Sequence, residues 1–165
     1  MRNSNLIALA FLVQVVILGA TSQARAQAER VHYPVRAPLD QYLIADEKSE
    51  IALARSAAPG SISDGAEVMV LSRTGYRTAV KGGNGFLCIV ERSWGSATDQ
   101  AEFWNPKVRA PHCFNPASAR TFLPIDLMKT QLVLAGKSKS EIAGATASAL
   151  DKKELPALER VRCAT

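Results

Sequence analysis

Turn-forming and strand-forming residues alternate most clearly in the stretch EVMVLSRTGYRTAVKGGNGFLCIVER, from Glu67 to Arg92. β-Branched, aromatic and aliphatic residues gather there in three runs, which predict strands over Val68–Leu71, Tyr76–Val80 and Phe86–Val90. The short segments between these runs are rich in glycine and asparagine, as tight turns are. The pattern therefore predicts a three-stranded antiparallel β-meander.

Both faces of the third predicted strand are apolar. Phe86, Cys88 and Val90 alternate with Leu87 and Ile89, and successive side chains of a strand point to opposite faces of the sheet. Neither face can be left against water, so we expect helices to cover both sides of the sheet.

Helical periodicity flanks the predicted meander. An N-terminal helix is predicted over residues 39–57, where apolar residues recur at three- and four-residue steps. Three further helices are predicted after the meander, over residues 117–122, 124–135 and 139–154. The second is expected to bury an apolar face made of Ile125, Met128, Leu132 and Ala135, and the third begins at a capping-box pair, Ser138 and Glu141. The predicted class is α+β, with C-terminal helices packed on the sheet.

The first 26 residues have the three regions of a secretory signal peptide. Arg2 precedes an apolar run from Leu6 to Ala20, and small residues follow, so cleavage is expected after Ala26 or Ala28. A membrane anchor is the alternative, but the run is shorter than the ~20 residues of a spanning helix, so no stable span is expected after cleavage. The predicted organisation is a leader over 1–26, an extended arm over 27–38 and a single domain over 39–165.

The charge of the chain does not indicate nucleic acid as a partner. The sequence has 20 Lys and Arg against 15 Asp and Glu. Removing the leader takes away Arg2 and Arg25 and no acid, which leaves 18 basic residues against 15 acidic ones and a net charge of +3. An excess this small and dispersed gives no basic patch for phosphates.

Three cysteines remain after the leader: Cys88, Cys113 and Cys163. Export to an oxidising compartment favours their pairing. We prefer a Cys88–Cys113 disulfide, because it would fasten the segment after the meander to the sheet and remove loop entropy worth on the order of 3 kcal/mol. Pairing of either residue with Cys163 stays open, since spacing does not fix connectivity.

The segment from Ser93 to Pro116 is the least regular and is predicted as a long aromatic loop. Ordered loops of this length are uncommon unless they serve a site or are pinned by packing and cross-links. The candidates for a binding surface are Trp94, Phe103, Trp104, His112 and Phe114. The alternative for the four aromatic residues is a small core beneath the loop, because large aromatic side chains are more often buried than displayed.

No familiar catalytic or metal-binding pattern emerges from the sequence. His112 adjoins Cys113, but adjacent residues seldom place an imidazole and a thiol in the geometry of a catalytic dyad. His32, His112 and the cysteines lack the spacing of a zinc site, so we expect neither metal nor cofactor. Two acids that flank a bound sugar can act as acid and base, and the acids near the loop are Glu91, Asp99 and Glu102. Scattered acids around a loop are usually solvated.

The chain contains the stretches GYRTAVKGGNGFLCIVERSW, FWNPKVRAPHCFNPASARTFLP and LAGKSKSEI. These resemble an uncharacterised family of small exported bacterial proteins, through the segments NGF-x-C, FWNPK and CFNP. The resemblance covers residues 51–155 and implies an exported single domain with three cysteines and no established activity. Members of that family continue beyond the last cysteine into a segment with further aromatic and histidine residues, so a site in that segment is expected to be missing here.

The function that the sequence predicts is a non-catalytic binding or accessory module, periplasmic or secreted, that uses the aromatic loop. Its partner would be a small molecule or an envelope protein. Two alternatives stay open. One is an exported hydrolase that uses His112 with a nearby acid, and the other is a structural envelope protein whose partner pairs with the sheet edge or with Cys163.

Overall fold

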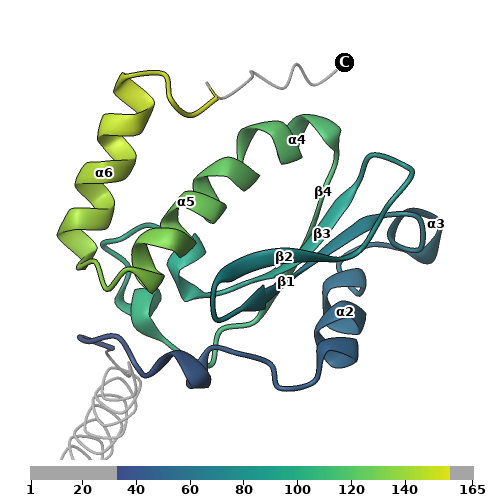
Figure 1. Ribbon diagram of the computed structural model, residues 1–165, viewed down its shortest axis with the longest axis horizontal. Coiled ribbons are helices and arrows are strands. Elements are labelled where there is room, and N and C mark those ends of the chain that lie inside the picture. Colours follow the sequence, from purple (N-terminus) through teal and green to yellow (C-terminus); the bar gives the residue numbers. More distant parts are fainter. Residues whose placement is uncertain (1–32, 157–165) are drawn as a thin grey trace, which may run out of the picture. The chain divides into compact units, whose positions relative to one another are not determined.

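The computed structural model describes residues 33–156. The predicted leader, residues 27–32 of the predicted arm, and Cys163 lie outside the described residues. The described chain forms the following helices, 3-10 turns (η) and strands, in order (Figure 1): η1 (Leu39–Gln41), α2 (Glu47–Arg55), α3 (Gly60–Ser63), β1 (Glu67–Ser72), β2 (Gly75–Val80), β3 (Leu87–Glu91), η2 (Ser93–Gly95), η3 (Ala101–Trp104), β4 (Ala110–Phe114), α4 (Pro116–Thr121), α5 (Leu123–Leu134) and α6 (Lys139–Asp151).

The four strands form one mixed sheet in the order β2-β1-β3-β4. β1 pairs antiparallel with β2, and β3 pairs antiparallel with β4. β1 and β3 run parallel, with Glu67 opposite Leu87 and Val68 opposite Cys88. The predicted α+β class is confirmed. The prediction of a three-stranded antiparallel meander is wrong, because β1 lies between β2 and β3 in the sheet. A fourth strand, β4, lies in the segment that was predicted as a loop.

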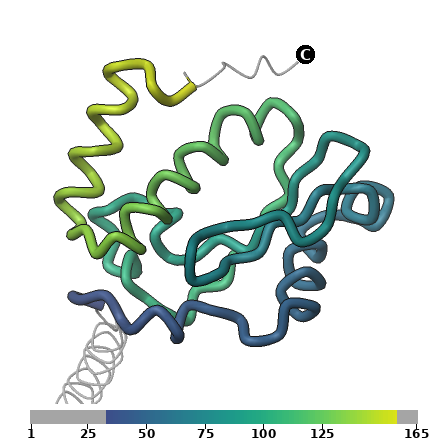
Figure 2. Tube along the Cα trace, in the orientation of Figure 1, coloured from purple at the N-terminus to yellow at the C-terminus, as the bar shows by residue number. Residues whose placement is uncertain are grey.

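The connection from β2 to β3 crosses the start of β1 and does not turn back beside β2 (Figure 2). Gly83 N donates to Gly65 O at 2.9 Å, and Glu67 N donates to Phe86 O at 2.9 Å, so the crossing segment is bonded to the chain beneath it. Gly82 lies so close to this chain that a Cβ there would overlap the backbone nitrogen of Glu67. Its missing side chain therefore permits a close backbone approach, where the sequence had suggested a hairpin turn.

Helices cover both faces of the sheet, as expected (Figure 1). On one face α2 packs against β1, β3 and β4, and the buried cluster comprises Ala54, Ala66, Val68, Cys88 and Val90. On the other face α5 packs against β2 and η2, and the buried cluster comprises Tyr42, Leu71, Trp94, Phe103, Trp104, Val133 and Ile142. The last helix, α6, packs on α5.

The predicted N-terminal helix is divided into η1 and α2. Asp46 caps α2, because its side chain accepts from Ser49 N at 2.9 Å. In the segment before α2, the carbonyl of Tyr42 accepts from Arg92 Nε at 2.6 Å, and Arg92 directly follows β3. The break thus follows from a long-range hydrogen bond that local periodicity does not reveal.

The predicted C-terminal helices are present, with shifts of a few residues at their ends. The capping box forms, with Ser138 Oγ accepting from Glu141 N and Glu141 Oε2 accepting from Ser138 N. The buried face of α5 differs from the predicted apolar stripe. Its buried residues are Leu123, Lys129, Thr130 and Val133, so two polar side chains lie on the side that packs inward.

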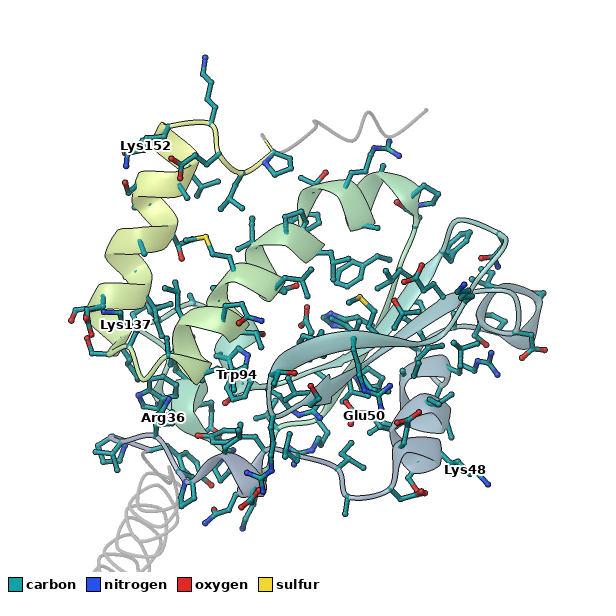
Figure 3. All side chains as sticks on the ribbon, in the orientation of Figure 1. Arg36, Lys48, Glu50, Trp94, Lys137 and Lys152 are labelled. Atoms are coloured by element: carbon teal, nitrogen blue, oxygen red, sulfur yellow. A yellow bond between two sulfur atoms is a disulfide. The ribbon has the colours of Figure 1, made fainter. Side chains whose placement is uncertain are left out.

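One ion pair is buried in the centre of the domain. Arg92 Nη2 donates to Glu50 Oε1 at 2.8 Å, and the two side chains are 0% and 2% exposed. Arg92 also donates to the carbonyls of Tyr42 and Val90, and Glu50 Oε1 accepts from Leu71 N at 3.0 Å. Glu50 projects from α2 toward the sheet (Figure 3). The pair thereby connects the N-terminal segment, α2, β1 and β3.

Removing one partner of this pair leaves the other charged and buried, which costs about 3–5 kcal/mol. Glu50→Ala is therefore expected to lower the free energy of unfolding by that amount in urea denaturation. Glu47→Ala, in the same helix, breaks only the exposed pair with Arg77 and should cost less than about 1 kcal/mol. Equal small losses in the two variants would contradict the central role of the buried pair.

Candidate functional site

The predicted disulfide is present and fixes β4 to β3. Cys88 and Cys113 lie directly opposite each other in the antiparallel pair and are bonded. The preference for this pairing is confirmed. Cys113 therefore has no free thiol. Its neighbour His112 points to the opposite face of the strand, so the two side chains form no catalytic dyad.

The aromatic side chains of the predicted loop divide into two groups. Trp94, Phe103 and Trp104 are 1%, 0% and 4% exposed and lie in the cluster beside α5. Trp94 Nε1 donates to Thr130 Oγ1 at 3.0 Å, and Figure 3 shows Trp94 directed toward α5. These three side chains hold the segment from inside, and Trp104 also borders a wide hollow beside Val35 and Lys137.

His112 and Phe114, the other two candidates, lie on β4 and share one face of the sheet. Their ring centroids are 5.9 Å apart in an edge-to-face arrangement. His112 Nδ1 lies 3.0 Å from Glu91 Oε2, and the two side chains are 49% and 14% exposed. The structure therefore places His112 next to an acid, as the hydrolase alternative requires. The sequence suggested that Glu91 is solvated, but its side chain is mostly buried.

Glu91 is also hydrogen-bonded to Asp126, which projects from the first turn of α5. We call Glu91 and Asp126 the acid pair. A hydrogen bond between two carboxyl groups requires a proton on one of them. Burial, together with the neighbouring Glu91, raises the pKa of Asp126 from 3.8 to about 8, and burial also raises the pKa of Glu91. The acid pair therefore retains one proton at neutral pH, which the two carboxyl groups share.

Lys129 follows Asp126 by one helical turn and is 6% exposed. Its Nζ donates to the carbonyls of Gly95 and Ser96, at 3.0 and 2.6 Å. Burial lowers the pKa of Lys129, while the acid pair opposes that shift. The lysine thus fastens η2 to α5 and partly balances the charge of the acid pair.

A cavity of about 260 Å³ opens beside the acid pair. We call it the loop cavity; its walls are formed by Glu91, Arg92, Ser93, Gly95, Ser96, Glu102, Val108 and Ala110. Ser93 is only 3% exposed, and its Oγ has no hydrogen-bond partner within residues 33–156. This Oγ has almost no accessible surface, so it is covered by the protein and does not open into the cavity. His112 is not among the lining residues.

Other hollows offer less chemistry. One of about 360 Å³ lies between residues 36–39 and the end of α5, where Arg36 already donates to the carbonyl of Val133. Another of about 580 Å³ is wide and is bordered by Val35, Lys137 and Lys139. Neither is lined by an acidic side chain, so the loop cavity is the better candidate.

Sequence reasoning missed Ser93, Asp126 and Lys129. A signal for the last two does exist, because Asp126, Lys129 and Thr130 fall at the three- and four-residue steps of one helix face. Val133 continues this face and is buried. Polar residues in register with a buried valine mark a helix face that carries polar groups inward. For Ser93 no comparable local pattern is present.

No family model, curated protein or solved structure matches the chain. Within residues 33–156, no helix has the length and apolar character to cross a membrane. In the same part of the chain, no three His, Cys, Asp or Glu side chains are grouped to hold a metal ion.

The burial of Trp104 makes it a core residue, so its truncation should mainly destabilise the fold. Trp104→Ala is expected to lower the free energy of unfolding by roughly 3–5 kcal/mol in urea denaturation. Phe122→Ala, at a side chain 45% exposed, serves as the aromatic control and should cost much less. If the Trp104→Ala protein were as stable as the wild type, Trp104 would not be a core residue.

The acid pair makes stability depend on pH. Between its ordinary pKa of 3.8 and about 8, the native protein keeps a proton on Asp126 that the unfolded chain has lost. Stability is therefore highest below pH 4 for this group and falls as the pH rises through about 8. Asp126→Asn should flatten the dependence of the urea midpoint on pH in this window.

Asp151→Asn, at the exposed end of α6, is the control and should keep the wild-type slope. An Asp126→Asn protein that keeps the wild-type slope would show that the shared proton lies elsewhere.

Proposed function

We propose that this protein is an exported, non-catalytic binding module whose ligand site is the loop cavity. Export is supported by the signal-peptide pattern of residues 1–26 and agrees with the Cys88–Cys113 disulfide, a bond typical of oxidising compartments. The proposed site lies in the segment that the sequence indicated, from Ser93 onward. Its ligand contacts are expected from polar groups of that segment and not from the aromatic side chains.

The observation that carries the proposal is a concave space of about 260 Å³ whose wall includes the acidic side chains of Glu91 and Glu102. A pocket with few polar groups on rigid elements is the usual form of a small-molecule site. The walls here are rigid for stated reasons. β3 and β4 are joined by the disulfide, η2 is bound to α5 through Lys129, and Trp94 and Trp104 are packed in the core.

A hydrolase remains the second candidate, favoured by the 3.0 Å contact between His112 Nδ1 and Glu91 Oε2. An acid that orients a histidine is part of many nucleophilic sites. Two features make it the weaker candidate. His112 does not line the loop cavity, and the thiol of its neighbour Cys113 is bonded to Cys88. The structural alternative, pairing at the sheet edge, would use β2 or β4, which are the outer strands.

Filling the loop cavity should abolish binding without unfolding the protein. We would screen free amino acids, monosaccharides, small amines and small carboxylates by their effect on backbone amide NMR signals. At least one compound is expected to shift the amides of Gly95, Ser96 and Ala110. In Val108→Trp these shifts should disappear, because Val108 lines the cavity and the indole would occupy it.

Val35→Trp is the matched control, because Val35 is 74% exposed and lies outside the loop cavity. It should retain the shifts, and both variants should keep a thermal midpoint near that of the wild type. Shifts that persist in Val108→Trp, or a screen in which no compound moves these amides, would refute the proposed site.

A further inference from the structure

The hollow between residues 36–39 and the end of α5 is apolar apart from one cation. Its volume of about 360 Å³ is typical of small-molecule sites. We call it the arginine hollow; Arg36 lines it together with Ala37, Pro38, Leu39, Tyr42, Val133 and Leu134. The hydroxyl of Tyr42 is used within the protein, because it accepts from Ala37 N at 3.2 Å and donates to Trp104 O at 2.8 Å. The side chain left to meet a polar ligand is therefore that of Arg36.

Arg36 is exposed and lies at the C-terminal end of α5 (Figure 3). Its Nη1 donates to the carbonyl of Val133, in the last turn of the helix. Its Nη2 lies beside Gly136, where a Cβ atom would be 3.9 Å from it. Within residues 33–156, neither Nη2 nor Nε of Arg36 forms a hydrogen bond. A guanidinium has five N–H groups, so it can cap α5 through one nitrogen and bind a carboxylate through the others.

The surroundings of Arg36 are positively charged. The wide hollow bordered by Val35 is also lined by Arg36, together with Lys137 and Lys139, and neither hollow is lined by an acid. Lys137 pairs with Glu141 on the surface, whereas Lys139 donates to a neutral carbonyl. Arg36 and Lys139 form no ion pair within residues 33–156. An anion bound at Arg36 would therefore meet positive charge that ion pairs in this part of the chain balance only at Lys137.

We propose that the arginine hollow is a second binding site, for a small organic acid whose carboxylate is bound by Arg36 and whose apolar part lies against Leu39 and Leu134. A carboxylate fits because its two oxygens match the planar fork of a guanidinium. An apolar body fits because the other side chains of the wall are apolar or have their polar group bound within the protein. The inference does not rest on the proposed function, because it concerns a different hollow.

Four probes separate the charge of the ligand from its apolar part. Benzoate, benzamide and benzamidinium have nearly the same planar shape and differ in charge, and acetate has the charge of benzoate without the ring. Each is titrated into the full chain at neutral pH while the amide signals of Ala37, Leu39 and Leu134 are followed by NMR. Benzoate is expected to bind about tenfold more tightly than benzamide, because charge-assisted hydrogen bonds are stronger than neutral ones. It should also bind about tenfold more tightly than acetate, because its ring buries apolar surface. Benzamidinium should leave these signals unmoved.

Variants assign the contacts. Arg36→Gln should reduce the affinity for benzoate to that for benzamide, and Arg36→Lys, which keeps the charge, should retain part of the preference. Arg120→Gln is the matched control, because Arg120 is an exposed arginine on α4, outside the arginine hollow. Leu39→Ala should weaken benzoate and benzamide by the same factor, because both lose the same apolar contact. If Arg36→Gln does not fold, Lys139→Gln in the wide hollow should still narrow the preference for benzoate.

Two results would overturn the inference. One is that benzamide or benzamidinium moves these amides as strongly as benzoate, or that no probe moves them. The other is that Arg36→Gln and Arg120→Gln bind benzoate equally well. The amides of Gly95 and Ser96 report on the loop cavity separately, so failure at the arginine hollow leaves the proposed function standing.

Discussion

The buried pair of Arg92 and Glu50 is the interaction on which the rest of this domain depends. An ion pair out of water is stable only when its remaining hydrogen-bond groups are also satisfied, and here they are met by Tyr42 O, Val90 O and Leu71 N. Each of these contacts comes from a different part of the chain. The pair can therefore form only when the N-terminal segment, α2, β1 and β3 are all in place, which makes it a constraint on the topology of the whole domain.

The loop cavity is a consequence of how the segment after β3 is held. Trp94, Phe103 and Trp104 are turned inward, so the chain from η2 to β4 is fixed by its own large side chains and not by contact with solvent. The disulfide closes the other end by bonding β4 to β3. A segment anchored at both ends and from inside can keep a concave polar surface open, because collapse of that surface would require the aromatic core to move.

The predictions from sequence succeeded where the determining contacts are local. The strand runs, the capping box of Ser138 and Glu141, and the Gly136 end of α5 could be predicted because propensity and capping act over a few residues. The meander was wrong, since the crossing of β1 depends on Gly82 packing against Glu67, which a hairpin-like composition cannot reveal. β4 escaped notice because Pro111 interrupts any strand pattern. The acid pair could not be predicted, because α5 must dock before Asp126 meets Glu91.

Two adjacent residues at the end of β3, Glu91 and Arg92, have different roles: one lines the loop cavity beside the acid pair, and the other stabilises the core. Glu91 and Arg92 are neighbours in sequence, yet Arg92 is fully occupied in the buried ion pair, whereas Glu91 faces Asp126, His112 and the loop cavity. The Arg92 guanidinium donates to Glu50 and to two backbone carbonyls, so it does not pair with the Glu91 carboxylate. The proton that the acid pair retains removes the repulsion that two close carboxylates would suffer, and Lys129 partly balances the charge that remains. The charge beside the loop cavity is thus set by the neighbours that the fold gives Glu91.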